Sequence, residues 1–425
     1  MASPRSAAAV VLIREISSLE VFWVRRAPRM MFQGGFYAFP GGQLEPDEEP
    51  RVGAARELLE ETGVHVDPSS LVNVGRWVTP AFAPRRFDTY FFLAKCPLKE
   101  EARLATDEHD FGAWVQPAAA LAHWMRGEVL MAPPVRHALE CLSAGLDQIQ
   151  ARMTASPYAH GESIPEIEMK PGIVLVPLRT PTLPPATHTN CYVIGGDKVI
   201  VIDPASPYTE EQALLDRALE GRNILEIWLT HLHRDHVSGA NHLRQKRGIK
   251  IAAHPVTARD LQGIVDVDRT FSEHEQVELA GKPGWTLQVF HTPGHARGHV
   301  CIFESRSGSL ITGDLMAGLG TIVIDPPEGH MATYFDSLRK MQALPVTALF
   351  PAHGPVMANA KDKIQEYLDH RTARERNILA AWNRGHRDPS AIVKEVYTDV
   401  APAMYSLAER SVVAHLEKLR EEKRI

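Results

Sequence analysis

The sequence is poor in cysteine and has no long apolar segment. Its 425 residues include four cysteines, which lie at least 45 positions apart and form no Cys-x-x-Cys pair. Neither a disulfide framework nor a cysteine zinc site is therefore predicted. The longest apolar runs, such as residues 7–13, fall far short of the ~20 residues that a membrane-spanning helix needs. We expect a cytoplasmic protein with no membrane partner.

An excess of positive charge is also absent. The chain has 46 lysines and arginines against 52 aspartates and glutamates, a net charge of −6, which argues against nucleic-acid binding by the molecule as a whole. Residues 361–425 are the exception, with 13 basic and 11 acidic side chains. Any contact with a polyanion must therefore be local.

Hydrophobic patterning divides the chain into several folded parts. Strand patterns surround a helix pattern at 50–62 in the first part, and an irregular polar stretch follows it. From residue 172 short β-branched runs alternate with helical stretches, and apolar spacings of three and four predict a small helical unit at the end. The predicted fold is α/β and α+β multidomain, with domains at 1–155, 172–355 and 356–425 and a linker at 156–171.

Three carboxylates share one face of the helix expected at 50–62. Glu57, Glu60 and Glu61 are spaced at i+3 and i+4, so their like charges repel unless a cation lies between them. One or two carboxylates together with substrate phosphates are the usual ligands of Mg²⁺. Arg56 is placed to pair with Glu48 across the preceding loop. We therefore predict a magnesium site on this helix.

The surrounding segment resembles the Nudix box of the Nudix hydrolases. The match covers Gly42, Glu48, Arg56, Glu57, Leu58, Glu60, Glu61, Gly63 and Val64. The resemblance implies an α/β/α sandwich in which the three glutamates bind Mg²⁺ or Mn²⁺ and are catalytic. It also implies that the glycine shapes the loop and that the Glu48–Arg56 pair holds loop and helix together. The implied substrate is a small molecule linked to a nucleoside diphosphate, whose diphosphate is hydrolysed.

Segments around the box are similar to the Nudix subgroup that includes coenzyme A diphosphatases. Arg85 and Arg86 lie in one of these segments and are candidates for substrate phosphate contacts, although an arginine pair in a loop is also a common surface feature. An alternative is a Nudix fold that senses a nucleotide and regulates its neighbour. The complete set of three glutamates argues against it, because a sensor does not need them all.

A second cluster of metal-ligand residue types follows the apolar run at 224–230. Four of them lie within six positions: His231, His233, Asp235 and His236. Each of four others also follows an apolar run: Asp203, His295, Asp314 and His353. A loop can direct successive side chains towards two metal sites, and nitrogen and oxygen ligands of this kind suit Zn²⁺ best, with Mn²⁺ or Fe²⁺ as alternatives.

The order of these residues resembles the metallo-β-lactamase superfamily, which implies an αββα sandwich with a two-metal centre. The resemblance implies that the first ion is bound by His231, His233 and His295 and the second by Asp235, His236 and His353. It also implies that Asp314 bridges the two ions and that Asp203 orients the first histidines without binding a metal itself. Such a centre activates water, and Asp235 is the ligand for which we also expect a catalytic role.

The C-terminal part resembles the winged-helix C-terminus of the β-lactamase-like protein 2 family, endoribonucleases that act on single-stranded RNA. Six basic residues are candidates for its phosphate-facing side: Arg371, Arg374, Arg376, Lys418, Arg420 and Lys423. Helical arginines mixed with glutamates are also typical of a solvated face. We therefore predict a small winged-helix-like unit, with single-stranded RNA as a candidate partner.

The function expected first for the second domain is endoribonuclease-like hydrolysis of RNA phosphodiesters by a dinuclear zinc centre. The main alternative is a thioesterase of the hydroxyacylglutathione hydrolase kind, whose metal motif is nearly the same. A Nudix domain that cleaves coenzyme A would suit an acyl-thioester substrate. The sequence favours no particular oligomeric state.

Overall fold

The computed structural model describes residues 3–162 and 164–425, and the chain separates into two compact units, Met1–Val176 and Pro177–Ile425. Within the described ranges no helix has the length and apolar character needed to cross a bilayer. The first unit contains β1 (Arg5–Glu15), β2 (Leu19–Arg26), β3 (Tyr37–Ala38), β4 (Gly41–Gln43), α1 (Pro50–Thr62), η1 (Pro68–Ser70), β5 (Val72–Val78), β6 (Phe87–Lys95), β7 (His109–Val115), α2 (Pro117–Met125), α3 (Pro133–Ser143), α4 (Ile149–Thr154) and η2 (Pro157–Ala159).

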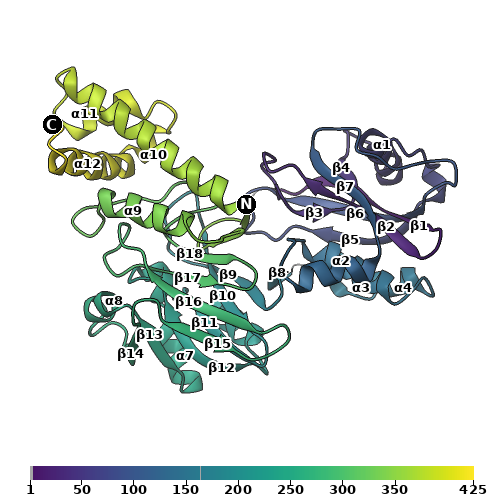
Figure 1. The fold of residues 1–425 in the computed structure, drawn as a ribbon, viewed down its shortest axis with the longest axis horizontal. Coiled ribbons are helices and arrows are strands. Elements are labelled where there is room, and N and C mark those ends of the chain that lie inside the picture. The colour runs from purple at the N-terminus through teal and green to yellow at the C-terminus, as the bar shows by residue number, and fades with distance from the viewer. Residues whose placement is uncertain (1–2, 163) are drawn as a thin grey trace. The chain divides into compact units, whose positions relative to one another are not determined.

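The sheet of the first unit is buried on both faces. Its strands follow the order β3-β2-β1-β6-β5, with β4 beside β1 and β7 beside β2. Successive side chains of a strand point to opposite faces, and β1 uses this alternation: Val10 and Leu12 join Leu58 of α1, whereas Val11 and Ile13 join a core that includes residues of α2 and α3. Figure 1 shows α1 on one face and α2, α3 and α4 on the other. The α/β/α sandwich is confirmed.

Local chain chemistry determines both ends of α1. The Glu49 side chain accepts hydrogen bonds from the backbone N–H groups of Arg51 and Val52, which satisfies donors that a helix start leaves free. Gly63 ends the helix with a φ of 73° and donates its N–H to Leu59, a conformation that glycine adopts without steric cost. The helix that carries the three box glutamates is therefore defined at both ends.

The segment 156–171, expected to be a linker, contains regular structure. It includes η2 and β8 (Ile167–Lys170), while Ser163 lies outside the described residues. Strand β8 pairs antiparallel with β9 (Ile173–Arg179), and the division between the two units falls inside β9. The polar composition of the segment gave no periodicity by which to predict this short strand.

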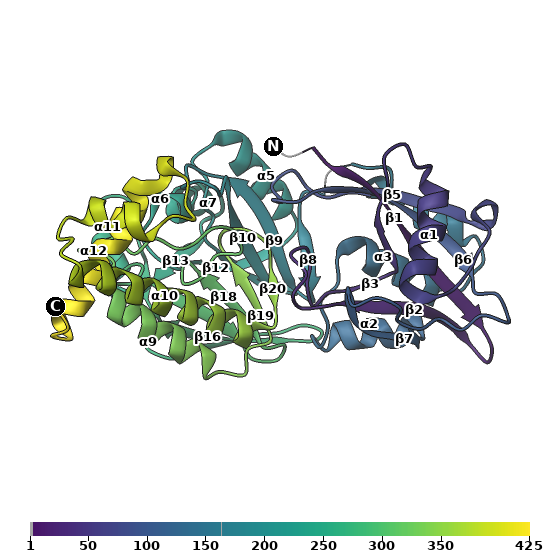
Figure 2. The same cartoon turned by 90° about the horizontal axis from the view of Figure 1, so that it is seen from above.

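The second unit has two sheets between layers of helices. One sheet has the order β14-β13-β12-β11-β10-β9-β8 and the other the order β15-β16-β17-β18-β19-β20. Figure 2 shows α5 and α7 on the outer side of the first sheet and α9 and α10 on the outer side of the second. This arrangement is the expected αββα sandwich. The further elements are β10 (His188–Gly195), β11 (Lys198–Ile202), α5 (Thr209–Ala218), β12 (Asn223–Leu229), α6 (Arg234–Val237), α7 (Ala240–Arg247), β13 (Lys250–Ala253), α8 (Pro255–Asp260), β14 (Arg269–Thr270), β15 (Gln276–Leu279), β16 (Trp285–His291), β17 (Val300–Glu304), β18 (Ser309–Gly313), α9 (Met331–Gln342), β19 (Ala348–Pro351) and β20 (Met357–Ala358).

Three helices follow β20, and the first of them belongs to two hydrophobic cores. They are α10 (Ala360–Asn383), α11 (Pro389–Val396) and α12 (Tyr405–Glu421), with η3 (Pro402–Met404) before the last. Ile364 in the first half of α10 packs in a core with residues of α9. Ile378 in the second half packs instead with Val393 of α11 and Val412 of α12. The helical tail predicted from the apolar spacing is thus present, and α10 joins it to the rest of the unit.

Replacing Leu58 with alanine should destabilise the first unit by about 2–5 kcal/mol, because the side chain is fully buried between α1 and the sheet. The neighbouring Leu59 is 43% exposed, so Leu59→Ala should cost far less. Hydrogen exchange of peptides from α1 would give the free energy of opening in each variant. Equal losses in the two variants would contradict the orientation of this helix.

Candidate functional site

The candidate ligands of the second unit lie at the ends of strands. Asp203 follows β11 and His231 follows β12, which are parallel neighbours in the first sheet. Asp314 follows β18 and His353 follows β19 soon after its end, and these strands are parallel neighbours in the second sheet. The carboxyl ends of parallel neighbours lie at the same edge of a sheet, which is where α/β proteins place their sites. The two sheets therefore supply ligands to one place.

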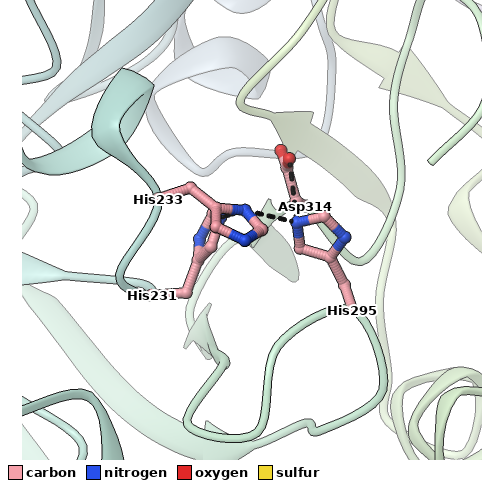
Figure 3. Close-up of side chains that lie close together, drawn as sticks. All are labelled: His231, His233, His295 and Asp314. Atoms are coloured by element: carbon pink, nitrogen blue, oxygen red, sulfur yellow. Dashed lines mark hydrogen bonds and ion pairs between the residues drawn. The ribbon is translucent and has the colours of Figure 1, made fainter. Parts of the chain in front are cut away.

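Four side chains form the first group of potential ligands. The donor atoms of His231, His233, His295 and Asp314 lie within 4.8 Å of one another. His233 Nδ1 is 3.0 Å from His231 Nε2 and 2.9 Å from His295 Nε2. His295 Nε2 is 3.4 Å from Asp314 Oδ2. Figure 3 shows the three imidazoles and the carboxylate turned towards one another.

A second group of ligands shares the same aspartate. It consists of Asp235, His236 and His353, whose donor atoms also lie within 4.8 Å of one another. Asp314 Oδ1 is 3.5 Å from His236 Nε2 and 3.3 Å from His353 Nε2. Because Asp314 Oδ2 faces the first group, this carboxylate lies between the two groups.

Hydrogen bonds on the outer side fix the orientation of the rings. His295 Nδ1 donates to the carbonyl of Val323 over 2.8 Å, and His353 Nδ1 donates to the carbonyl of His188 over 3.0 Å. In a neutral ring that donates through Nδ1, Nε2 carries no hydrogen, which is the form that binds a metal ion. Both rings therefore present a lone pair to the centre of the cluster.

Asp203 holds histidines of both groups. Its carboxylate accepts the backbone N–H and the hydroxyl of Thr230 over 2.8 and 2.6 Å, and Thr230 Oγ1 lies 3.0 Å from His231 Nδ1. The same carboxylate lies 2.8 Å from His236 Nδ1. Asp203 adopts a φ of 50°, a region that costs free energy for most residues and that aspartate and asparagine tolerate better than others. This strain places the carboxylate behind the cluster.

Burial and neighbouring charges strongly shift the pKa values of histidines in the cluster. Burial, together with the neighbouring His236 and His233, holds the pKa of His231 well below its ordinary value. Burial acts in the same direction on His236, but the carboxylates of Asp314, Asp235 and Asp203 outweigh it and raise the pKa. Among the described residues His236 Nε2 and Asp314 Oδ1 are buried without a hydrogen-bond partner. Buried donor atoms without partners, converging from imidazoles and carboxylates, fit a metal site.

A cavity of about 960 Å³ opens onto this cluster. The ligands His233, Asp235, His295, Asp314 and His353 form part of its wall. Most of the remaining lining is apolar and comes from loops 181–186 and 317–328 and from the C-terminal helices, with residues such as Leu319, Ile322, Val400, Met404 and Leu407. The tail therefore forms part of the cavity next to the metal cluster.

Arg371 and Arg374, predicted as part of a phosphate-facing side of the tail, do not lie on an exposed face. They are 3% and 9% exposed and line this cavity. Helical spacing shows which residues share a face, but here that face is covered by α9, α11 and the loop around residue 322. Arg374 forms a bidentate ion pair with Asp399 and stacks at 4.0 Å on Tyr397.

The other four basic residues predicted for the phosphate-facing side differ in their contacts and exposure. Lys418 forms ion pairs with Glu375 and Glu422, both at 2.8 Å, so its charge is already neutralised. Arg420 lies over the ring of Trp382 at 5.6 Å. Arg376 and Lys423 are exposed. These six residues do not form one continuous phosphate-facing surface.

In the first unit, the box residues lie on β4, on α1 and on the loop between them. A Cβ added to Gly42 would lie 2.5 Å from Glu57 Oε2, so only glycine leaves room for that carboxylate. Arg56 binds Glu48 through Nε and Nη2, each at 2.9 Å. Its Nη1 reaches Glu57 at 2.8 Å and Glu60 at 3.1 Å. One arginine thus connects the loop with two of the three box glutamates.

The third box glutamate, Glu61, is buried. It accepts a hydrogen bond from the Gly41 N–H over 2.8 Å and lies 3.8 Å from His109. Burial raises the pKa of Glu61 to about 8, and nearby Glu57 and Glu108 act in the same direction. Over residues 3–162 and 164–425, the only sets of three or more ligands whose donor atoms lie within 4.8 Å of one another are the two in the second unit. The three box carboxylates are therefore adjacent but not convergent.

The two candidate phosphate contacts of the first unit have different surroundings. Arg85 is exposed and its Nη2 lies 3.2 Å from the sulfur of Met31. Arg86 is anchored by a hydrogen bond from Nε to the carbonyl of Thr79 over 3.0 Å. Only Arg85 thus presents its side chain on an exposed loop.

Three residues near the two sites were not predicted from the sequence. Glu328 lies 3.6 Å from His233 Nε2, and Glu108 raises the pKa of Glu57 and Glu61. His299 accepts the backbone N–H of Asp314 over 3.0 Å. The two glutamates stand in irregular loops without a pattern, and His299 could have been found only from its closeness in sequence to His295.

Family profiles match three parts of the chain. The NUDIX domain matches residues 3–132, the metallo-beta-lactamase superfamily matches 184–353, and the beta-lactamase associated winged helix domain matches 389–425. In this chain residues 389–425 contain α11, η3 and α12 and no strand. The predicted combination of domains is confirmed.

Known proteins resemble mainly the second unit. The beta-lactamase-like protein 2 homolog of Caenorhabditis elegans is 32% identical over 54% of this chain and 78% of its own length. The atrochrysone carboxyl ACP thioesterase of Aspergillus fumigatus is 31% identical over 54% of this chain and 71% of its own length. The thioesterase AacuM of Aspergillus aculeatus is 33% identical over 46% of this chain, which spans only 60% of that relative. A beta-lactamase domain protein from Burkholderia ambifaria has the same fold, with a TM-score of 0.53 and 20% identity over 63% of this chain and 91% of its own.

Replacing Asp203 with asparagine should weaken metal binding about 10–100-fold, because the outer partners of metal-binding histidines contribute this much. Asparagine also tolerates the positive φ of this position, so the change removes the charge without adding strain. Competition with a fluorescent zinc chelator would measure the dissociation constants. Asp336→Asn is the matched control, because Asp336 is exposed and pairs with Arg339 on the surface. Unchanged zinc affinity in Asp203→Asn would contradict the role of Asp203.

Replacing Gly42 with alanine should reduce diphosphate hydrolysis by roughly 10–100-fold with little loss of stability, because the new methyl group displaces only the flexible end of Glu57. Gly63→Ala should show the opposite pattern. It meets no neighbouring atom but has a φ of 73°, so it should cost about 1–2 kcal/mol and leave turnover intact. Mg²⁺-dependent turnover and the melting temperature, measured for both variants, would separate the two effects.

Proposed function

The chain belongs to the metallo-β-lactamase superfamily and carries a Nudix domain before that fold, so it is a metal-dependent hydrolase, and we propose that its second unit hydrolyses an acyl thioester. Water adds to the carbonyl carbon, the C–S bond breaks, and a carboxylic acid and a thiol are released. For the first unit we propose hydrolysis of the diphosphate of a nucleoside-diphosphate-linked molecule.

The ligand assignment in this proposal follows the donor atoms. We infer that His231, His233 and His295 bind one ion and that Asp235, His236 and His353 bind another, with Asp314 between them. Imidazole and carboxylate donors favour Zn²⁺. Ions bound in this way lower the pKa of water and polarise a carbonyl group. In the first unit the box glutamates are the proposed ligands of Mg²⁺ or Mn²⁺.

The cavity is the observation that carries the thioester proposal. Its lining beyond the metal cluster is mostly apolar and includes Leu319, Ile322 and Met404, which suits a hydrocarbon acyl chain. RNA binding instead needs several unpaired cationic side chains along a groove. Of the four arginines that line the cavity, two are already paired with carboxylates: Arg374 with Asp399 and Arg410 with Asp325. The thioesterase names of several relatives agree with this choice.

A cytoplasmic location fits the same proposal. All four cysteines are free and three of them are buried, and such thiols persist in a reducing compartment. Acyl thioesters and nucleotide cofactors are the proposed small-molecule partners there.

Purified protein should hydrolyse acyl-coenzyme A thioesters with zinc and diphosphate-linked nucleotides with magnesium. The two activities should be separable, because the two ligand sets share no residue. Asp235→Asn should abolish thioester turnover and spare diphosphate hydrolysis, whereas Glu57→Gln should do the reverse. Release of thiol and of nucleotide monophosphate would be followed in both variants. Cleavage of single-stranded RNA that Asp235→Asn abolishes, without any thioester turnover, would overturn the proposal in favour of RNA.

A further inference from the structure

One guanidinium group in the wall of the cavity is buried without an anionic partner. Arg371 of α10 is 3% exposed and lines the cavity together with Asp314 and His295. In the part of the chain that the structure describes, its Nε has no hydrogen-bond partner and no carboxylate lies within ion-pair distance. An unpaired buried charge is unfavourable, so this position needs an explanation.

Neutral groups surround this guanidinium. Its Nη2 donates to Thr321 Oγ1 over 3.1 Å and to the carbonyl of Ile322. The guanidinium carbon lies 5.3 Å from the centre of the Tyr334 ring. The titratable side chains that sense its charge are Tyr334 of α9, Tyr367 and His370 of α10, Tyr397 after α11 and His415 of α12. Burial lowers the pKa of both histidines, and an imidazole carries no negative charge in either protonation state, so neither histidine compensates the charge of Arg371.

Two other arginines that line the same cavity are paired with carboxylates. Arg374, one turn further along α10, pairs with Asp399, and Arg410 of α12 pairs with Asp325 at 2.9 Å. The chain thus supplies carboxylates for these two arginines and none for Arg371. A ligand that enters the cavity can supply the missing negative charge.

We propose that Arg371 is an anion-binding subsite, which receives a phosphate or carboxylate from the thiol-bearing part of the substrate. The proposal rests on the thioester function proposed above. Loop residues connect this subsite with the reaction centre, because the carbonyl of Ile322 binds Arg371 and the carbonyl of the next residue, Val323, binds His295. A substrate whose carbonyl lies at the metal cluster can therefore extend its anionic part along this loop to Arg371.

Three thioesters distinguish this role from a purely structural one. Hexanoyl-coenzyme A carries phosphates, S-hexanoylglutathione carries carboxylates, and hexanoyl-N-acetylcysteamine carries neither. In full-length, zinc-loaded Arg371→Met, kcat/KM should fall about tenfold or more for the anionic substrate that uses the subsite, because a hydrogen bond to a charged group is lost. For the neutral thioester, kcat/KM of Arg371→Met should stay within about twofold of the wild-type value. Which anionic substrate responds identifies the source of the charge.

Two further variants complete the comparison. Arg371→Lys keeps the charge and should retain part of the preference for the anionic substrate. Arg376→Met, on the exposed side of the same helix, should change none of the three values. An equal loss for all three thioesters in Arg371→Met would show that Arg371 only supports the loop at Thr321 and Ile322, and would overturn the subsite.

A binding measurement separates this inference from the proposed function. If the wild-type protein hydrolyses none of the three thioesters, the thioester function fails, but the subsite can still be tested. Calorimetric titration of the zinc-loaded protein with pantetheine 4′-phosphate and with S-methylglutathione should show binding of at least one, weakened about tenfold by Arg371→Met and unchanged by Arg376→Met. No difference between wild type and Arg371→Met with either compound would overturn the subsite.

Discussion

The carboxylate of Asp203 is the contact on which the cluster of the second unit depends. It accepts two hydrogen bonds from Thr230, and through that residue it orients His231, while the same group lies beside His236. Histidines from both ligand groups are thus fixed to the ends of two parallel strands. Asp203 is buried and has a backbone φ of 50°, a conformation that persists where the surrounding structure holds it in place.

The candidate metal ligands converge in the second unit but not in the first, and the chemistry of the ligands explains the difference. Neutral imidazoles can pack together and be held from behind by carbonyl groups, as His295 and His353 are. Carboxylates repel one another, and the box glutamates are separated by Arg56, by burial and by exposure to solvent. The donor atoms of the second unit therefore already converge, whereas the box carboxylates of the first unit do not.

The resemblances carried by the glutamate box and by the histidine and aspartate motif predicted the two sandwiches. Residue types that follow apolar runs indicated which side chains the second cluster brings together. Sequence patterns failed where burial depends on distant segments. The spacing of Arg371 and Arg374 fitted an exposed helical face, but the loop around residue 322 and α11 cover that face. Glu328 and Glu108 gave no signal, because loop residues reach a site through the path of the chain and not through periodicity.

Helix α10 belongs to two hydrophobic cores, and this determines how the C-terminal helices are joined to the rest of the second unit. Its first half belongs to the core with α9 and its second half to the core with α11 and α12, so no flexible hinge lies between the hydrolase fold and the tail. The C-terminal helices thus form part of the wall of the cavity that opens onto the candidate metal ligands. Substitutions in that part of the wall can change which molecules the cavity admits, while the candidate metal ligands, which follow the strands, stay unchanged. Selectivity and reactivity can thus evolve on separate stretches of one polypeptide.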